Sequence, residues 1–247
     1  MDRMVYIGMT GARENMLAQQ AHANNLANAT TTGFKSDMSQ ARAMQVFGEG
    51  HASRVYAMTE RPATNLDSGT LIETARSLDV AIQGDGWMAV QAEDGTEAYT
   101  RMGELQVNSL GVLVTGSGLP VMGNGGVPVV LPPFEKIEIA NDGTISIRPQ
   151  GEAATELVVA DQIKLVRPDT ETFFKGSNGL MRTDNQVPLE PALDVELRSG
   201  YLESSNVNAV HELTSMITLH RQFEMNIKMM TTAQENSSAA AKILELS

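Results

Sequence analysis

The sequence contains no cysteine, so disulfide scaffolds, cysteine-ligated zinc sites and thiol catalysis are excluded. Basic residues are also scarce: 18 Lys and Arg stand against 30 Asp and Glu, which gives a formal net charge of −12. A nucleic-acid partner would need a basic face to replace the counterions of the phosphate backbone, and an anionic membrane surface attracts the same kind of face. We therefore expect neither as a partner.

Long apolar runs are missing as well. No stretch approaches the ~18 unbroken apolar residues of a membrane-spanning helix. The first ten residues contain no apolar segment followed by a small-residue cleavage site, so we expect no ordinary signal peptide. Aromatic residues make up only 4% of the chain, whereas methionine occurs 15 times. Flexible methionine side chains suit surfaces that must fit irregular partners.

None of the sequence patterns that carry enzyme chemistry is present. There is no G-x-S-x-G, S-x-x-K or Walker sequence, and the four histidines form neither H-x-x-x-H nor H-E-x-x-H. Residues 84–89 (GDGWMA) match the dinucleotide pattern G-x-G-x-x-A, but residues 87–91 resemble a strand where a phosphate site needs a helix. We expect a turn here, no enzyme activity, and no cofactor, metal or small-molecule substrate.

Proline and glycine divide the chain into three parts. All nine prolines lie within 62–191, and 14 of the 21 glycines lie within 84–179. Residues 12–32 and 201–247 contain neither. Because both residues mark turns and weaken helix interiors, the ends are predicted to be helical and the middle to be β-rich.

The N-terminal helix is predicted over residues 2–28 and should end in the threonines and glycine of residues 28–33. Its positions with 4-3 heptad spacing are Val5, Met9, Ala12, Met16, Gln19, Ala23 and Leu26. The amide-rich segment 24–28 (NNLAN) has two interpretations. Its amides either cap a fraying helix end or bond to a neighbouring subunit, and the residues alone do not decide between them.

The C-terminal helix is predicted over about residues 207–246. Ten positions hold 3-4 spacing: Leu213, Met216, His220, Phe223, Ile227, Met230, Gln234, Ser237, Ala241 and Leu244. Seven of these ten residues are apolar. His220 is either a buried, hydrogen-bonded histidine or an interface residue. The helix would be ~60 Å long. We expect it to need a partner along its length, because helix propensity alone seldom sustains such a helix in water.

The middle is predicted to consist of short antiparallel strands joined by tight turns at Asp94-Gly95 and Asn141-Asp142-Gly143. Strands are expected at 78–82, 87–91, 98–101, 105–107, 112–114, 127–131, 137–139, 145–147 and 163–166. Many short strands at even spacing favour a small sandwich or open barrel. The expected division is an N-terminal helix (1–33), an extended connector (34–70), a β-rich domain (71–202) and a C-terminal helix (203–247).

Several segments resemble signatures of the bacterial flagellar rod and hook proteins. They are residues 24–35 (NNLANATTTGFK), 78–87 (LDVAIQGDGW), 98–105 (AYTRMGEL), 200–208 (GYLESSNVN) and 221–225 (RQFEM). Within this family, the opening MDR, the segment 44–50 (MQVFGEG) and the segment 223–230 (FEMNIKMM) favour a member that builds the proximal rod. The chain also lacks the large inserted domain of a hook protein. A distal rod member is the nearest alternative.

The resemblance implies an α+β fold in which long N- and C-terminal helices pair as a coiled-coil-like module beside a central antiparallel all-β domain. It implies a structural subunit of the basal-body rod, exported by the flagellar type III apparatus without cleavage. The subunit would assemble head-to-tail with other rod proteins and copies of itself across the periplasm, forming the axial drive shaft that transmits torque. A secreted β-domain binding protein with helical oligomerisation ends is the remaining alternative.

The two helical seams and the amide segment together supply the residues that we expect at the assembly interface. These are Val5, Met9, Met16, Asn24, Asn25, Leu26, Asn28, Leu213, Met216, His220, Phe223, Ile227, Met230 and Leu244. A seam rich in flexible side chains would accept partners that differ slightly from one another. On this interpretation the interfaces themselves are the functional residues.

Overall fold

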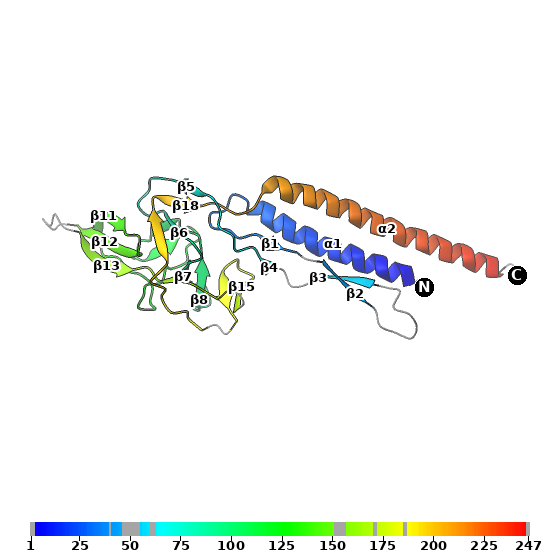
Figure 1. Cartoon of the computed structure of the whole chain (residues 1–247), viewed down its shortest axis with the longest axis horizontal. Helices are drawn as coiled ribbons and strands as arrows, with labels where there is room; N and C mark the ends of the chain where they lie inside the picture. Colours follow the sequence, from blue (N-terminus) through cyan, green and yellow to red (C-terminus); the bar gives the residue numbers. More distant parts are fainter. Residues whose placement is uncertain are drawn as a thin grey trace. The chain divides into compact units, whose positions relative to one another are not determined.

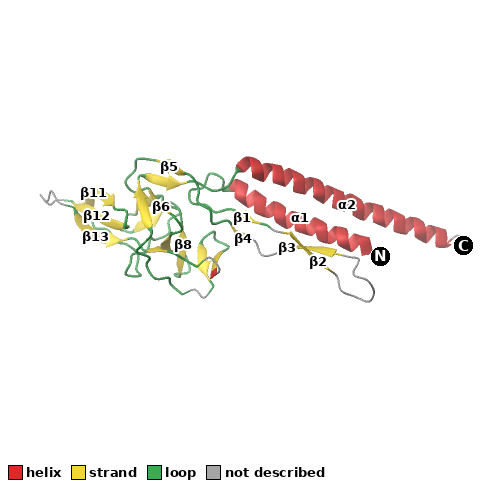
Figure 2. Ribbon diagram, in the orientation of Figure 1, coloured by secondary structure: helices red, strands yellow, loops and turns green. Residues whose placement is uncertain are grey.

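The computed structural model describes residues 3–39, 41–45, 55–59, 63–150, 157–169, 172–184 and 187–245. Within them the chain forms two α-helices and a set of antiparallel β-sheets, which confirms the predicted α+β class (Figures 1 and 2). The described residues fall into two compact units. The helical unit lies within residues 1–29, 36–65 and 207–247, and the β unit lies within residues 30–35 and 66–206.

The helical unit is built on α1 (Arg3–Ala27) and α2 (Ala209–Glu245), which lie side by side (Figure 1). α1 ends in a tightened turn, because the backbone N–H of Asn28 donates to the carbonyl oxygens of Asn24 and Asn25 at 3.2 and 3.1 Å. Both helices lie close to their predicted ranges.

The start of α2 is capped by Asn208. Its side-chain oxygen accepts hydrogen bonds from the backbone N–H groups of Val210 and His211, at 3.1 and 3.2 Å. These N–H groups have no partner within the helix, so the cap stabilises its first turn. Figure 1 shows that the far end of α2 extends beyond the first residue of α1.

The same unit contains four short strands in the range where the sequence predicts an extended connector. They are β1 (Asp37–Met38), β2 (Ala41–Gln45), β3 (Val55–Thr59) and β4 (Ala63–Thr64). β1 pairs with β4 and β2 pairs with β3, both antiparallel. α1 contacts β1 and β3. The strands are too short, and too poor in β-branched residues, for a period of two to be visible in the sequence.

Among its described residues, the β unit contains fourteen strands. They are β5 (Leu71–Glu73), β6 (Val80–Gln83), β7 (Trp87–Gln91), β8 (Glu97–Thr100), β9 (Leu105–Val107), β10 (Leu113–Thr115), β11 (Phe134–Ile139), β12 (Thr144–Pro149), β13 (Val158–Gln162), β14 (Leu165–Val166), β15 (Phe173–Lys175), β16 (Met181–Thr183), β17 (Glu196–Ser199) and β18 (Tyr201–Glu203). They form a five-stranded sheet in the order β14-β7-β8-β16-β15, a three-stranded sheet in the order β11-β12-β13, and the pairs β9-β10, β6-β17 and β5-β18. The expected strands are therefore divided among several small sheets.

The glycine turns lie where the sequence predicts them. Gly95 joins β7 to β8 and Gly143 joins β11 to β12, with φ of +79° and +82°, in the left-handed region that favours glycine. Residues 87–91 form a strand, so the helix that a dinucleotide site requires does not begin after the GDG turn.

The prediction of a strand at 127–131 is wrong. Only isolated bridges involve Pro128 and Val130, because proline has no N–H for a ladder.

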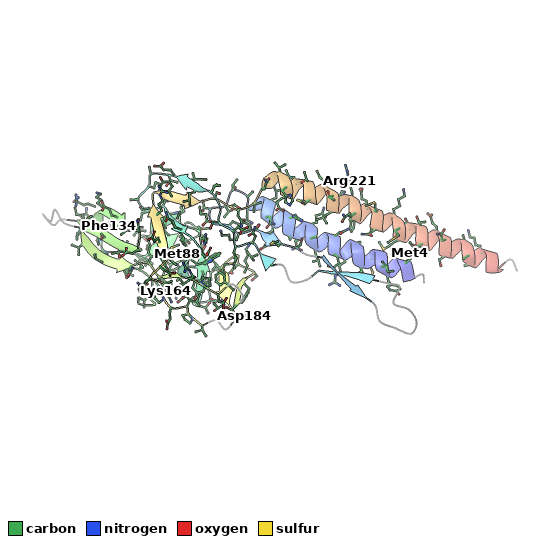
Figure 3. All side chains as sticks on the ribbon, in the orientation of Figure 1. Met4, Met88, Phe134, Lys164, Asp184 and Arg221 are labelled. Carbon is green, nitrogen blue, oxygen red and sulfur yellow. The ribbon has the colours of Figure 1, made fainter. Side chains whose placement is uncertain are left out.

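The core of the β unit is largely apolar and includes a buried polar network around Glu97. The rings of Trp87 and Phe173 meet edge-on with centroids 5.0 Å apart. Beside them, the Lys164 ammonium (labelled in Figure 3) lies 2.8 and 2.9 Å from the two carboxylate oxygens of Glu97. The Tyr99 hydroxyl donates to Glu97 and accepts from the backbone N–H of Leu189, both at 2.9 Å. Burial raises the pKa of Tyr99 above its ordinary value.

Candidate assembly site

The helices meet through small residues of α1. A Cβ atom on Gly8 would lie 2.7 Å from Cγ of Met230, and one on Gly11 would lie 3.1 Å from Nδ2 of Asn226. Ala12, on the same face, is buried. Because these positions carry little or no side chain, the Met230 and Asn226 side chains lie directly against the α1 backbone.

A polar contact joins the C-terminal part of α1 to the first turn of α2. Nδ1 of His22 lies 2.5 Å from Oε2 of Glu212, and the two side chains are only 19% and 8% exposed. A shift of one helix along the other would separate these groups and bury each without its partner. Buried polar contacts of this kind favour one register over others.

α2 carries two parallel stripes of heptad-spaced residues. The inner stripe is buried or half-buried and comprises Glu212, Met216, Leu219, Phe223, Asn226, Met230 and Ala233. The second stripe, which we call the outer seam, is exposed and comprises Val210, Leu213, Ile217, His220, Glu224 and Ile227. Val210 is 71% exposed and Ile217 is 55% exposed, so α1 does not cover this seam.

α1 has a matching exposed stripe. The outer face of α1 comprises Tyr6, Met9, Arg13, Met16, Gln20 and Ala23. Met9 and Met16 are 55% and 58% exposed, and the adjacent Leu17 is 42% exposed. Arg13, Met16 and Leu17 line an open groove together with Met216 of α2. Met216 belongs to the inner stripe, but on the surface of α2 it neighbours Leu213 and His220 of the outer seam, three residues before it and four after it. By this helical spacing, the outer face of α1 and the outer seam of α2 lie on one side of the helix pair, which we call the apolar face.

The opposite side of the helix pair carries a mixture of polar and apolar side chains. A second groove runs between α1 and α2 there, and amide side chains such as Asn15 and Gln222 line it together with Met225. Met4 and Met225 are 47% and 62% exposed and line a further groove on this side. Arg221, labelled in Figure 3, points away from α1.

The structure divides the interface residues predicted from the two seams. Val5, Leu26, Met216, Phe223 and Met230 are half-buried, whereas Met9, Met16, Leu213, His220 and Ile227 are exposed. The predicted seam runs along the border between the inner stripe and the apolar face, because the apolar arc of each helix is wider than one heptad seam. Leu244 lies in the last turns of α2, and its side chain is outside the described part of the chain.

The amide-rich segment bonds within the chain. Asn25 is 1% exposed; its Nδ2 donates to the carbonyl of Asp37 at 2.9 Å, and its Oδ1 accepts from the N–H of Asp37 at 2.8 Å. The side chain thus pairs with β1 as a neighbouring strand would. Nδ2 of Asn28 donates to the carbonyl of Asn24 at 2.9 Å, as expected at a helix end. The Asn28 bond fits the capping interpretation, whereas the Asn25 bonds join α1 to β1, so we take Asn25 out of the proposed interface.

The β unit holds a buried ion cluster that the sequence did not reveal. The Glu203 cluster consists of Lys35, Arg101 and Glu203, all 3% exposed or less. Lys35 Nζ lies 2.7 Å from Oε1 of Glu203, and Arg101 Nη1 lies 3.1 Å from Oε2. The backbone N–H of Gly69 donates to the same carboxylate at 2.8 Å. Burial lowers the pKa of Lys35, and its hydrogen bond with Glu203 acts in the opposite direction.

The cluster joins three separate stretches of the chain. Lys35 follows the turn at Gly33, Arg101 directly follows the hairpin strand β8, and Glu203 ends β18. Each of these residues lies within one of the segments that resemble the flagellar signatures, and that position was the available signal. A single sequence does not indicate that they meet, because more than sixty residues separate each from the next.

The described residues offer little for catalysis or ion binding. No group of three His, Cys, Asp or Glu side chains among them could hold a metal ion. No helix in the described ranges is long and apolar enough to cross a bilayer.

Comparisons with known proteins give the family. The sequence model of the flagellar hook protein FlgE/F/G D1 domain matches residues 81–147, and that of the flagellar basal body rod FlgEFG protein C-terminal region matches residues 198–243. Flagellar basal-body rod protein FlgF of Salmonella typhimurium is 39% identical over 253 residues, and that of Escherichia coli is 37% identical over 253 residues. Each alignment covers 100% of both chains.

A relative with a different rod-protein name is also similar. Flagellar basal-body rod protein FlgG of Agrobacterium fabrum is 33% identical over 267 residues, covering 98% of this chain and 100% of its own. The chain belongs to the flagellar basal-body rod and hook protein family. It is a structural rod component of the FlgF kind and not an enzyme.

Proposed function

We propose that the chain is a subunit of the proximal rod, which assembles head-to-tail with other rod proteins and with copies of itself. The assembled rod is the axial drive shaft that transmits torque across the periplasm. The single observation that carries this proposal is the apolar face of the helical unit, where Met9, Met16, Leu213, Ile217 and Ile227 are exposed together. An apolar patch shared by two long helices marks an interaction surface.

In this proposal, α1 and α2 act as one coiled-coil-like module that forms the inner part of the rod, with the β-rich domain on the outside. The heptad-spaced inner stripe and the His22–Glu212 contact support a fixed register within a subunit. The exposed stripes then carry the contacts between subunits. Contacts in the rod are heterologous, because only head-to-tail contacts build an open helical assembly.

The predicted interface residues keep this role except for Asn25. The exposed ones contact neighbouring subunits directly, and the half-buried ones hold the helix pair in the shape that the neighbours recognise. Exposed methionines suit such a surface, because they adapt to related but different partners. The division into terminal helices, connector and outer domain also stays part of the proposal.

The route to the rod is part of the same proposal. The chain is exported through the flagellar type III apparatus and is not cleaved on the way. Export without cleavage predicts that rods contain the chain with its first residues intact. N-terminal sequencing of the rod fraction tests this, and a shortened chain would contradict it.

Charge substitution on the apolar face tests the assembly role. Leu213→Asp and Ile227→Asp should abolish swimming in a strain that lacks the natural protein, because a buried unpaired carboxylate opposes docking. Phe223→Asp should also abolish it, by loosening the helix pair. Gln222→Asp, at an exposed position on the opposite side of α2, is the matched control and should swim normally. Normal motility of the Leu213→Asp and Ile227→Asp strains would contradict the proposal.

The alternative assignments predict different outcomes. A distal rod subunit would be required for the outer rod segment, and rods lacking it would still contain their proximal part. A secreted β-domain binding protein with helical oligomerisation ends would be absent from purified basal bodies. Electron microscopy of basal bodies from a deletion strain separates the three: a missing proximal rod supports the proposal.

A further inference from the structure

Residues 30–35 (TTTGFK) are a short part of the β unit that stands in the sequence between two stretches of the helical unit. We call them the clip. The chain passes from one unit to the other on both sides of the clip, between residues 65 and 66, and between residues 206 and 207. Any force carried along the chain between the two units must pass through these crossings.

The backbone of the clip fits closely against the rest of the β unit. The N–H of Gly33 donates to the carbonyl of Glu203 at 2.8 Å, and the carbonyl of Phe34 accepts from the N–H of Asn206 at 3.3 Å. A Cβ atom on Gly33 would lie 2.3 Å from the backbone carbonyl of Arg101, so no side chain fits there. The clip therefore occupies a seat that matches its own backbone.

Lys175, the last residue of β15, contacts the clip through a different group. Its ammonium lies 3.9 Å from the centroid of the Phe34 ring and donates to the backbone carbonyl of Lys35 at 2.8 Å. Cation–π contacts and hydrogen bonds from a charged donor are both stronger where water is excluded. The clip is thus bound through its aromatic side chain as well as its backbone.

The Lys35 side chain joins the crossings. Its Nζ lies 2.7 Å from Oε1 of Glu203 and donates to the carbonyl of Asp67, also at 2.7 Å. Nδ2 of Asn206 donates to the same carbonyl at 3.0 Å. Lys35 and Asn206 stand directly at a crossing, and Asp67 stands one residue from another. The Lys35 ammonium and the Asp67 carbonyl therefore tie together three points at which the chain leaves the β unit.

The β unit keeps a balanced ion pair without Lys35. Nη1 of Arg101 lies 3.1 Å from Oε2 of Glu203, and the N–H of Gly69 donates to Oε1 at 2.8 Å. Lys35 is thus a second cation on one carboxylate, and its burial lowers its pKa. Because burying a surplus cation is costly, Lys35 adds little to the stability of the β unit. What it adds is the connection of the clip to Glu203 and Asp67.

We propose that Lys35 is a positioning residue for rod assembly, which seats the clip on Glu203 and holds the crossings together in the assembled subunit. The interface residues of the helical unit are then joined to the β unit at one fixed place. A subunit whose clip is released keeps its β unit folded but no longer transmits force through a defined connection. The inference rests on the proposed rod function for the assembly that Lys35 serves.

Lys35→Glu separates positioning from stability. It brings a second carboxylate to Glu203, which opposes seating of the clip, and it leaves the Arg101–Glu203 pair intact. The urea midpoint of the full chain, followed by the fluorescence of the buried Trp87, should shift by less than ~0.5 M. A strain that carries only this variant should not swim. Normal swimming, or a midpoint that falls as far as that of Glu203→Gln, overturns the proposal.

Lys136→Glu is the matched control. It makes the same change of charge at a half-exposed lysine of β11, whose partner is Glu138. The control should keep both the urea midpoint and swimming. Loss of swimming in the control would attribute the effect to net charge and would overturn the assignment to Lys35.

The double variant K35E/E203Q links the effect to Glu203. One carboxylate then faces the Arg101 guanidinium, so the charges of the cluster balance. The double variant should swim better than Lys35→Glu. If it swims no better, the loss does not arise from the contact with Glu203, and the proposal is overturned.

Amine acetylation of purified basal bodies measures the seating of the clip. Lys35 is 3% exposed and its ammonium is hydrogen-bonded, so acetic anhydride should modify it at least ~tenfold more slowly than in the urea-unfolded chain. Mass spectrometry of the peptide that contains Lys35 gives the rate. Equal rates in basal bodies and in the unfolded chain overturn the proposal.

The failure of this inference and the failure of the proposed function give different results. If deletion of the chain abolishes swimming but Lys35→Glu swims normally, only the positioning role is wrong and the rod role stands. If deletion of the chain leaves rods and swimming intact, the rod role is wrong and the positioning role fails with it.

Discussion

Neutralising Glu203 should destabilise the β unit more than any exposed ion-pair substitution. Its carboxylate is 1% exposed and accepts from Lys35, Arg101 and the N–H of Gly69. Glu203→Gln keeps the shape of the side chain but removes its charge. Two buried cations then face each other without the carboxylate that both contact, as when one partner of a buried ion pair is deleted.

The expected loss is about 3–5 kcal/mol, the range for breaking a buried ion pair. Small domains have free energies of unfolding of about 5–15 kcal/mol, so the variant should stay folded but with a small reserve. With a urea dependence of about 1–3 kcal/mol per molar, the unfolding midpoint should fall by at least ~1 M. The helical unit should keep its secondary structure.

The single tryptophan provides the assay. Trp87 is buried in the same unit, and the Arg101 guanidinium lies 5.2 Å from its ring centroid. Urea unfolding followed by tryptophan fluorescence therefore reports on the region of the cluster. Glu138→Gln is the matched control, because its partner Lys136 and Glu138 itself are about half-exposed, and it should lose less than ~1 kcal/mol. A Glu203→Gln loss of less than ~1 kcal/mol would refute the reasoning.

Three further predictions concern the same unit. Gly33→Ala should lower the free energy of unfolding by about 2–4 kcal/mol, because Gly33 has φ of +68° and a Cβ there would lie 2.3 Å from backbone atoms. The control Gly95→Ala also has a positive φ, but its Cβ would meet no atom within 4 Å, so it should lower the free energy of unfolding by only about 1–2 kcal/mol in the same urea assay. The raised pKa of Tyr99 predicts a contribution to stability that is present below pH 10 and is lost as the pH rises through the folded-state pKa. The decline in the free energy of unfolding above pH 10 should therefore be shallower in Tyr99→Phe. An equal decline in both proteins would contradict this prediction. Hydrogen bonds from the Thr96 hydroxyl and N–H lower the pKa of Asp94 to about 2. The midpoint of the Asp94 carboxyl signal in an NMR titration should lie there and should move towards 3.8 in Thr96→Ala. An unchanged midpoint would show that Thr96 is not the cause.

The terminal helices were predictable because the signals for them are local. Proline is missing from both ends, apolar residues recur at heptad spacing, and Asn208 provides a cap. The hairpin turns were predictable for a similar reason, since Asp94-Gly95 and Asp142-Gly143 specify positive φ at one residue. These elements depend on neighbours in the sequence.

The division of the apolar stripes was not predictable from the sequence. Leu213 and Met216 both belong to one apolar arc, but only Met216 faces α1. Which part of the arc is covered depends on the small residues Gly8 and Gly11 of the other helix, which admit Met230 and Asn226. Heptad spacing locates the arc and does not locate the partner.

The Glu203 cluster was missed because it depends on contacts between distant segments. Lys35, Arg101 and Glu203 each look like exposed charged residues in sequence, and charged side chains are rarely buried. They are buried together because the Glu203 carboxylate contacts both cations. The strands between residues 37 and 64 were missed for a different reason: they pair in ladders of two to five residues that carry no periodic signal.

The most direct test of the central claim is the protein content of purified flagellar basal bodies. Mass spectrometry of detergent-extracted basal bodies should find this chain together with other rod proteins, and should find it lost from strains that carry Leu213→Asp as their only copy. Its absence from intact basal bodies of swimming cells would contradict the account.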